Sequence, residues 1–234
     1  MIVHPSGSQL LLVTQPDHAA LAGTLICAWQ SDGLPTSARR EAIVLATRAH
    51  DDGWEEEDRL PIVDRASGRL LDFINAPADV RQRVWPRSVM RLSETPYSAA
   101  LVAQHAMSVY RSNRPNPEWV SFFRRMEGLR DSMLASCEAL TLEDLRRDYF
   151  FIRAGDLMSL MFCNAWTKPE QLDPYEVRLD GHRLHVAPDP FGGREVEFAI
   201  TARRVPQGPF MTATAAEAFR FAPVETLTGV ASGP

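Results

Sequence analysis

Lysine is nearly absent from this sequence, since Lys168 is the only one among 25 basic residues. A preference for arginine can serve phosphate binding, but a bias in genomic base composition explains it more simply. The basic residues are scattered, and the formal net charge is -5. The basic patch of a nucleic-acid-binding protein is therefore missing, and we expect a small-molecule substrate and no nucleic-acid partner.

Long apolar runs are missing as well. The longest one in the C-terminal half, Leu157–Cys163, is interrupted by Ser159 and spans about a third of the roughly 20 residues that a membrane helix needs. No lysine or arginine precedes Arg39, so the basic segment of a secretory signal is absent. We expect a cytoplasmic protein with no membrane partner.

Cysteine is scarce. The sequence has three, far apart and each within an apolar helical pattern: Cys27, Cys137 and Cys163. An odd number at wide spacing argues against a disulfide framework. We expect buried, reduced thiols.

The chain has 234 residues, of which 45% are hydrophobic and 24% charged, which fits one large domain or one domain with an appendage. The hydrophobic pattern predicts a mainly α fold, in which a helical bundle is flanked by β-structure from both ends. We divide it into an N-terminal β-hairpin (1–15), a helical domain (16–170), a small antiparallel β-sheet appendage (171–206) and a loosely structured tail (207–234).

Proline and capping residues mark the expected helix starts. Pro16, Pro96 and Pro117 suit the first turn of a helix, and Thr141 is a good cap residue. The predicted helices run from 16 to a stop before Asp32, and over 37–50, 78–90, 96–111, 117–139 and 142–166. Predicted strands cover 2–3, 9–13, 176–179, 183–187 and 196–205.

Four polar residues occupy helix faces that otherwise carry apolar side chains. His18 shares its face with Leu21 and Leu25, and Asp156 is the lone charge on its stripe. His50 and His105 lie on apolar faces of two other helices. A ligand that builds a site in a bundle core projects from such a face, and a buried carboxylate is costly unless it is paired or bound to a metal.

Each of these residues has another interpretation when taken singly. A lone histidine on an apolar face is more often a hydrogen-bonded core residue, and Asp156 can pair with Arg153 one turn earlier. Together, however, three histidines and an aspartate face inward from four helices, and Asp51 adjoins His50. This combination favours a metal site.

The order of these residues resembles the HD-domain metal-dependent phosphohydrolases, whose pattern is a histidine, a His-Asp doublet and a late aspartate. Here His18, His50-Asp51 and Asp156 follow that order, and His50–Gly53 resembles the His-Asp-x-Gly start of the doublet segment. A closer resemblance is to an uncharacterised bacterial family known only as a domain of unknown function. It is carried by Gln15–His18, His50–Trp54, Pro96-Tyr97 with His105, and Asp156–Leu160, and it covers roughly residues 10–166.

The resemblance implies an HD-like helical bundle over residues 16–170, with four metal ligands: His18, His50, Asp51 and Asp156. Dinuclear members of the superfamily need about two further histidines, whereas His105 is the only one left in the helical region. We therefore expect one divalent transition metal. Mixed nitrogen and oxygen ligation suits Mn, Fe, Co, Ni or Zn better than Mg or Ca.

Other residues near these positions are candidates for catalysis. His105 is a candidate general acid or base, or a water-mediated fifth ligand. The run 51–58 has six acids in eight residues, which is a solvated acidic loop unless Asp52 or Glu55 faces the metal as a proton donor while Trp54 walls the pocket. Many HD enzymes have lysine at the position of Trp54, which is a departure from their pattern.

We predict a metal-dependent hydrolase of the HD type that attacks a small phosphoester or nucleotide with a metal-activated water. Arg153 is a candidate contact for the substrate phosphate, although pairing with a nearby acid is the simpler interpretation. Two alternatives stay open: an iron-dependent oxygenase, a chemistry of some dinuclear HD proteins, and a non-catalytic protein that binds a metal or ligand.

Overall fold

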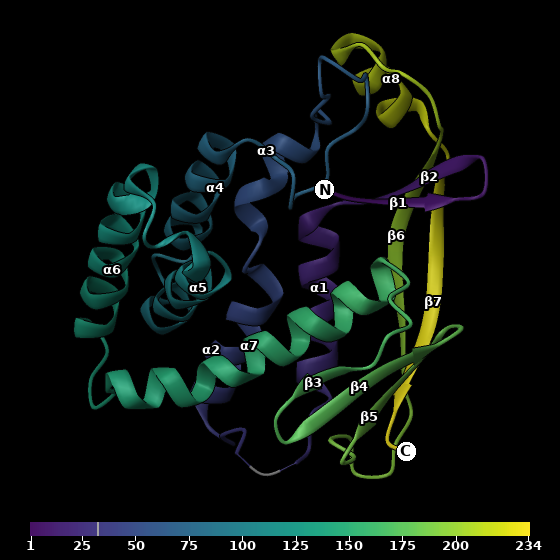
Figure 1. Ribbon diagram of the computed structural model, residues 1–234. Helices are drawn as coiled ribbons and strands as arrows, with labels where there is room; N and C mark the ends of the chain where they lie inside the picture. Colours follow the sequence, from purple (N-terminus) through teal and green to yellow (C-terminus); the bar gives the residue numbers. More distant parts are fainter. Residues whose placement is uncertain (32) are drawn as a thin grey trace.

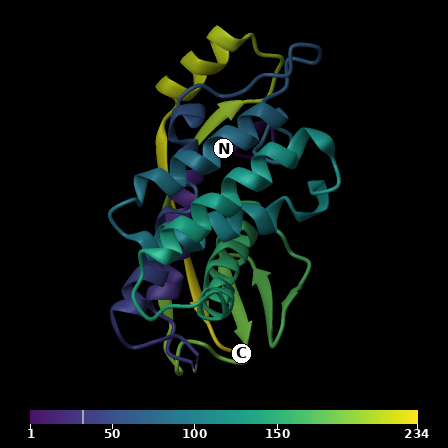
Figure 2. The same ribbon diagram turned by 90° about the vertical axis from the view of Figure 1, so that its left-hand side faces the viewer.

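The structure is a computed structural model that describes residues 1–31 and 33–234. One sheet stands along one side of the molecule, and most helices form a thick layer on one side of that sheet, with only part of this layer in contact with it (Figures 1 and 2). Helix α8 (Thr212–Phe221) lies apart from that layer, at one end of the long strands β6 (Val196–Pro206) and β7 (Val224–Ser232). Asp32, before which the first helix is expected to end, lies outside the described residues.

The helix bounds agree with most of the predicted ones. The helices are α1 (Gln15–Cys27), α2 (Ala38–Ala49), α3 (Glu55–Asp58), α4 (Ala78–Arg91), α5 (Pro96–Val109), α6 (Val120–Ala135), α7 (Leu142–Cys163) and α8 (Thr212–Phe221). Short 3-10 helices lie between some of them: η1 (Asp52–Trp54), η2 (Arg111–Asn113) and η3 (Pro117–Trp119).

Local capping explains where the site-bearing helices begin. The Thr14 side chain accepts a hydrogen bond from the Asp17 amide at the start of α1, and Ser37 accepts one from the Arg39 amide at the start of α2. At α7, Thr141 and Asp144 cap each other reciprocally. These bonds satisfy amide groups that have no partner inside a helix.

The prediction of a mainly α fold with separate β pieces is wrong, because the described residues form a mixed α/β fold around one seven-stranded sheet. Its order is β1-β2-β6-β7-β5-β4-β3. The strands are β1 (Ile2–Ser6), β2 (Gln9–Val13), β3 (Glu170–Leu172), β4 (Tyr175–Asp180), β5 (Arg183–Ala187), β6 (Val196–Pro206) and β7 (Val224–Ser232).

Three long-range pairings join the N-terminal hairpin and the C-terminal segment to the strands between them. Strand β2 of the N-terminal hairpin pairs antiparallel with β6, for example Leu11 with Arg204. Strand β7 pairs antiparallel with β6 on one side and parallel with β5 on the other. The segment expected to be a loose tail thus supplies α8 and a strand near the middle of the sheet.

Gly229 makes the position of β7 possible. A Cβ atom at this glycine would lie 2.5 Å from the Phe198 ring and 2.7 Å from the Phe162 ring. The two rings themselves pack edge to face, with centroids 4.8 Å apart. The lack of a side chain lets β7 pass over this aromatic pair, which joins the sheet to α7.

A buried ion pair connects α2, α5 and α7. Asp148 is fully buried, and Arg39 donates to both of its carboxylate oxygens, at 2.5 and 2.8 Å. The Tyr97 hydroxyl donates to the same carboxylate at 2.6 Å. Because α5 lies in the centre of the helical layer, with Ala99–Ala103 buried, this network fixes the helices around the polar cluster described below.

Two further observations concern membrane-spanning helices and the cysteines. No helix in them combines the length and the apolar character needed to cross a membrane. The cysteines are free, as expected, but only Cys163 is buried; Cys137 is half-buried and Cys27 is exposed.

Candidate metal centre

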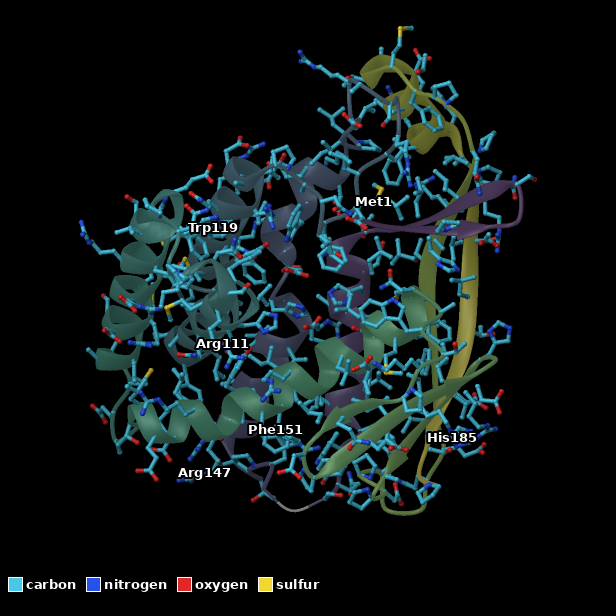
Figure 3. The ribbon with its side chains drawn as sticks, viewed as in Figure 1. Met1, Arg111, Trp119, Arg147, Phe151 and His185 are labelled. Atoms are coloured by element: carbon cyan, nitrogen blue, oxygen red, sulfur yellow. The ribbon has the colours of Figure 1, made fainter. Side chains whose placement is uncertain are left out.

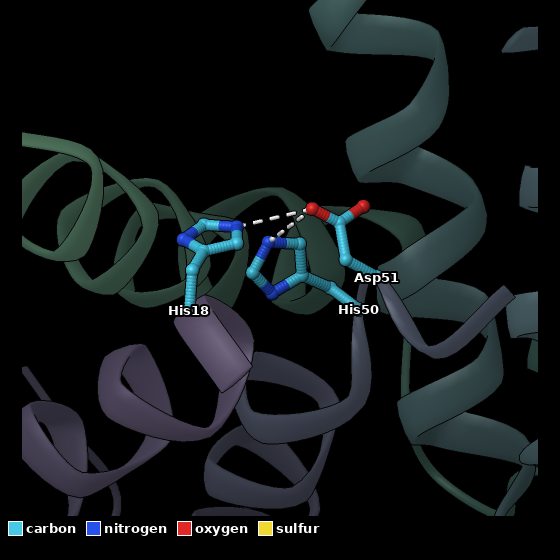
Figure 4. A group of neighbouring side chains, drawn as sticks. All are labelled: His18, His50 and Asp51. Carbon is cyan, nitrogen blue, oxygen red and sulfur yellow. Dashed lines mark hydrogen bonds and ion pairs between the residues drawn. The ribbon is translucent and has the colours of Figure 1, made fainter. Parts of the chain in front are cut away.

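Four helices bring three histidines and two aspartates together in the interior. His18 comes from α1, His105 from α5 and Asp156 from α7, while His50 ends α2 and Asp51 follows it. Figure 4 shows His18, His50 and Asp51 pointing toward one another. These five residues, which we call the polar cluster, include all four metal ligands expected from the sequence.

The spacing of the side-chain atoms is that of ligands around an ion. His18 Nε2 lies 3.0 Å from Asp51 Oδ2 and 3.7 Å from Asp156 Oδ1, and His50 Nε2 lies 3.5 and 3.6 Å from the same two atoms. His105 Nε2 lies 3.7 Å from Asp156 Oδ2. Two ligands at ~2.1 Å from a metal are ~3.0 to 3.5 Å apart in octahedral or tetrahedral geometry.

Hydrogen bonds fix the orientation of two imidazoles. His50 Nδ1 donates to the Thr47 carbonyl at 2.7 Å. His18 Nδ1 lies 2.7 Å from Ser159 Oγ, which donates its own proton to the Asp156 carbonyl and so accepts from the imidazole. Both rings therefore direct Nε2 toward the cluster, the orientation that metal-binding histidines usually show.

Two buried polar atoms in the cluster have no hydrogen-bond partner among the described residues, namely His50 Nε2 and Asp51 Oδ1. An unsatisfied buried polar atom costs ~1 to 3 kcal/mol, so such atoms in a native site call for an explanation. A metal ion satisfies them, and the mixed imidazole and carboxylate set suits a divalent transition metal. The residues present therefore fit the metal that the sequence predicts.

The electrostatics favour positive charge at the centre. Burial disfavours the charged form of His50, but Asp51 and Asp156 outweigh it and raise its pKa to about 9. Burial also opposes the ionisation of Asp156, yet its contacts with the histidines hold the pKa of this carboxyl well below its usual range. In contrast, burial lowers the pKa of His105 to about 4, so this imidazole is neutral at pH 7.

A second layer of residues supports Asp51. The Gln15 side chain donates to Asp51 Oδ2 at 3.2 Å. The Gln15 backbone amide in turn donates to buried Asp58 at 2.5 Å, and the Met1 amino group donates to the other Asp58 oxygen at 2.5 Å. Gln15 thus connects the start of α1 and the end of α3 to the polar cluster.

Gly155 allows α7 to approach α1 and α2 closely. A Cβ atom there would lie 2.7 Å from Thr47 Cγ2 and 2.9 Å from Ile26 Cγ1. Because Asp156 is the next residue, this close packing brings its carboxylate to His18 and His50.

Asp156 also marks the accessible side of the cluster. Its side chain is 19% exposed, whereas the other four are at most 6% exposed. Tyr149, two turns earlier on α7, lies on this side, with its hydroxyl 3.2 Å from His105 Nδ1. Burial raises the pKa of Tyr149 to about 12, so the phenol is protonated at neutral pH.

The acidic run that follows the doublet is mostly taken up in ion pairs. Arg83, Arg87 and Arg91 are spaced four residues apart on α4 and pair with Glu55, Glu56 and Glu57. Arg59 also pairs with Glu55, which is 44% exposed. The structure therefore does not bring Glu55, a predicted catalytic residue, into the cluster.

The other predicted residues differ in where they lie. Asp52 is half-buried beside Asp51, and burial raises the pKa of its carboxyl. Trp54 is buried and lines a small cavity with Met1 and Asp58, so it does not wall the exposed side. Arg153 is exposed on α7 and, among the described residues, makes no ion pair with Asp156.

Sequence reasoning missed the residues that orient the ligands. Gln15, Tyr149 and Ser159 contact cluster residues, but uncharged polar side chains on a helix carry no strong pattern of their own. Two signals were available: Gln15 and Ser159 lie inside segments that carry the family resemblance, and Tyr149 and Ser159 lie near Asp156 on one helix.

The fold and the site together define a class of protein. It is a mixed α/β domain with a buried cluster of histidines and aspartates that could hold a metal ion. The family comparison is more specific. Residues 1–207 match the family described as "Protein of unknown function (DUF3891)", and the chain belongs to this DUF3891 family. The comparison with curated proteins found no match, and neither did the comparison with solved structures.

The resemblance to a family of unknown function is thus confirmed, and the matched residues include the whole polar cluster but neither α8 nor β7. The resemblance to HD-domain enzymes stays a hypothesis.

Proposed function

We propose that this protein is a mononuclear metal-dependent hydrolase that acts on a small phosphoester. The observation that carries the proposal is the spacing of four residues: the Nε2 atoms of His18 and His50 lie 3.0 to 3.7 Å from carboxylate oxygens of Asp51 and Asp156. Two buried atoms of this set, His50 Nε2 and Asp51 Oδ1, have no hydrogen-bond partner among the described residues. His105 adds a third imidazole on the accessible side. The order of the residues along the chain supports a site of the HD type.

One ion, rather than two, fits the available nitrogen atoms. The two ligand groups, His18–His50–Asp51 and His50–His105–Asp156, share His50. Since Nδ1 of His50 is bonded to Thr47, only its Nε2 is free to bind a metal. A nitrogen lone pair binds one metal, so the two groups cannot hold two ions that both use His50. This argues against the dinuclear iron site that the alternative oxygenase reading requires.

The residues divide into those that hold the ion and those that act beside it. His18, His50, Asp51 and Asp156 are the proposed ligands. His105, whose Nε2 lies 3.7 Å from Asp156 Oδ2, is the proposed general acid or base or a fifth ligand that binds through a water. When bound, a divalent metal lowers the pKa of a coordinated water and supplies a nucleophile near neutral pH. Asp52 is the proposed proton-transferring group because it is a half-buried carboxylate next to Asp51. Glu55 is excluded because Arg59 and Arg91 bind its carboxylate.

Elemental analysis and activity together test this proposal. We expect about one transition metal per chain in protein purified without added metal, and hydrolysis of phosphomonoesters or nucleotides under anaerobic conditions. His50→Ala should lose both, whereas His182→Ala, at an exposed turn outside the cluster, should keep both.

Other outcomes identify the alternatives. Two irons per chain with oxygen consumption would establish the oxygenase. A bound metal with no hydrolysis of any phosphoester would contradict the hydrolase and favour a binding protein.

A further inference from the structure

We propose that a cleft between the β1–β2 hairpin and the connection from α3 to α4 binds a short apolar peptide with free amino and carboxyl termini. The cleft has a volume of about 690 Å³, within the range of small-molecule sites. Its walls are the hairpin, residues 64–75 and the chain directly after β6. None of the five polar-cluster residues lines it, so this inference does not depend on the proposed metal site.

The connection between α3 and α4 is long for a compact domain. It covers residues 59–77 and contains one isolated β-bridge, between Val63 and Leu70, but no helix and no named strand. Connections longer than ~12 to 15 residues without secondary structure of their own are uncommon and are often functional. The packing of the helices does not need so much chain, which favours a binding role for this segment.

Backbone hydrogen bonds hold the connection in place on both sides of the cleft. The Phe73 amide donates to the carbonyl of Met1, which Figure 3 labels, at 2.9 Å. The Phe210 amide donates to the Gly68 carbonyl at 2.7 Å. Gly68 has a φ of 70°, and a Cβ atom there would lie 2.8 Å from Pro209 Cβ. The walls of the cleft are therefore ordered and closely joined, as in a preformed site.

The floor of the cleft is apolar. Val3, Leu10 and Leu70 line it, and all three pack against a small hydrophobic cluster. Pro5, which pairs with Leu10 in the hairpin, adds to the same surface. Apolar side chains of a ligand gain free energy when they leave water for such a floor.

Two side chains that line the cleft have an oxygen atom left to accept a hydrogen bond. Asp72 Oδ1 accepts from the backbone and side-chain amides of Asn75, both at 2.8 Å, whereas no described residue bonds to Asp72 Oδ2. Gln207 Nε2 donates to the carbonyls of Gly7 and Gln9 at 3.0 and 3.2 Å. Both of its protons are thus used, and the Gln207 side-chain carbonyl is left for a donor.

Arg69 adds a positive charge to the same cleft. Its side chain is exposed, and its guanidinium makes no hydrogen bond or ion pair with any described residue. Asp64 is the other carboxylate of the cleft, but its oxygens accept from the Ala66 amide and the Ser67 hydroxyl. One cation and one anion, Arg69 and Asp72, therefore stay available to a ligand.

A free peptide carries the complementary groups. Its ammonium terminus pairs with Asp72, and its carboxylate binds the guanidinium of Arg69 through two parallel hydrogen bonds. A peptide N–H donates to the Gln207 carbonyl, because every peptide unit offers one such donor. Apolar side chains cover the floor. A dipeptide such as Leu-Leu has all four features.

Calorimetric titration with three related peptides tests the assignment. Leu-Leu should bind ~10-fold or more tightly than N-acetyl-Leu-Leu, which lacks the ammonium, and than Leu-Leu amide, which lacks the carboxylate. Asp72→Asn should remove the preference over the acetylated peptide, and Arg69→Gln the preference over the amide. The controls Arg65→Gln, in the same connection but not lining the cleft, and Asp131→Asn, on α6, should keep both preferences.

Three results would overturn the proposal: no binding of Leu-Leu, equal affinity for the three peptides, or preferences that persist in Asp72→Asn and Arg69→Gln. The titrations are run with Mn²⁺ and with chelator. Binding that requires Mn²⁺ and is lost in His50→Ala would place the peptide at the polar cluster and also overturn the cleft. Equal binding with and without Mn²⁺ supports the cleft, whether or not the proposed hydrolase activity is found.

Discussion

His50 Nε2 and Asp156 Oδ1 face each other across 3.6 Å in the buried centre of the molecule. This separation is too long for a good hydrogen bond, yet neither atom is turned away toward another partner. The hydrogen bond from His50 Nδ1 to the Thr47 carbonyl fixes the imidazole, and the packing of α7 fixes Asp156. The fold therefore keeps these two atoms apart. A cation that contacts both atoms is the simplest way to satisfy them.

Asp156→Asn should uncouple stability from metal. A metal bound only by the native state stabilises it by ~4 kcal/mol at a thousandfold excess over Kd, which corresponds to about 8 to 15 °C in Tm for a chain of this size. We expect chelation to lower the wild-type Tm by this order, and the Asp156→Asn midpoint to respond little. Asp131→Asn, at an exposed aspartate of α6, should respond like the wild type. A full metal response in Asp156→Asn would remove Asp156 from the site.

Gln15→Leu should weaken metal binding without removing a ligand. The substitution keeps the approximate size of the side chain but deletes the hydrogen bond to Asp51 Oδ2. Loss of a group that orients a metal ligand typically costs 10- to 100-fold in affinity. Competition with a coloured chelator measures this change. Gln82→Leu, whose amide bonds the Glu118 carbonyl instead, is the matched control, and equal affinities in the two variants would contradict the positioning role.

Gly155→Ala should damage both stability and the site. The new methyl group would lie 2.7 Å from Thr47 Cγ2 and 3.0 Å from the Ala22 carbonyl, so α7 must move away from α1 and α2. Overpacking of this kind costs ~1 to 3 kcal/mol, and the movement carries Asp156 with it. Gly128→Ala on α6 meets nothing within 4 Å and should stabilise by ~0.5 to 1 kcal/mol. Urea unfolding and metal titration of both variants check the contrast.

Arg39→Met should cost more stability than Tyr97→Phe. The first change leaves the fully buried Asp148 carboxylate without its cation, which costs ~3 to 5 kcal/mol. The second removes one hydrogen bond to a carboxylate, worth ~1.5 to 3 kcal/mol. The double variant Arg39→Met/Asp148→Leu should recover part of the loss. Denaturant midpoints that place Arg39→Met level with Arg124→Met, an exposed arginine of α6, would show that the buried pair is not needed.

Tyr110→Phe should flatten the loss of stability at alkaline pH. Burial raises the pKa of Tyr110 to about 12 in the folded chain, whereas an unfolded tyrosine ionises near pH ~10. Between these values the unfolded state has lost a proton that the folded state keeps, so stability falls as pH rises, by up to ~1.4 kcal/mol per pH unit. Unfolding free energies from pH 8 to 12 test this. Wild-type and Tyr110→Phe curves that stay parallel throughout would contradict it.

Local chemistry made most of the long helices predictable, although α3 and α8 were not predicted. Pro16, Pro96 and Thr141, and the start expected at 37, lie within a residue or two of the observed helix starts. The cluster residues were visible because a charge or imidazole on an apolar face contradicts the pattern around it.

The sheet was not predictable in the same way. The pairing of β2 with β6, and of β7 with β5, joins residues far apart in sequence and leaves no periodic signal at either partner. Threonine, alanine and Gly229 in β7 resemble a polar linker until the aromatic rings beneath them are known. Glu55 and Arg91 are likewise far apart in sequence and lie on different helices, so their ion pair could not be predicted from the sequence around Glu55.

The place of β7 between β6 and β5 has a consequence for biosynthesis. On the ribosome, Arg183–Ala187 and Val196–Pro206 are made well before Val224–Ser232, so each waits with an open edge of unpaired amide and carbonyl groups. Open edges recruit strands from other chains. A chain in which β7 has not yet been made therefore exposes two edges at which a strand of another copy can pair.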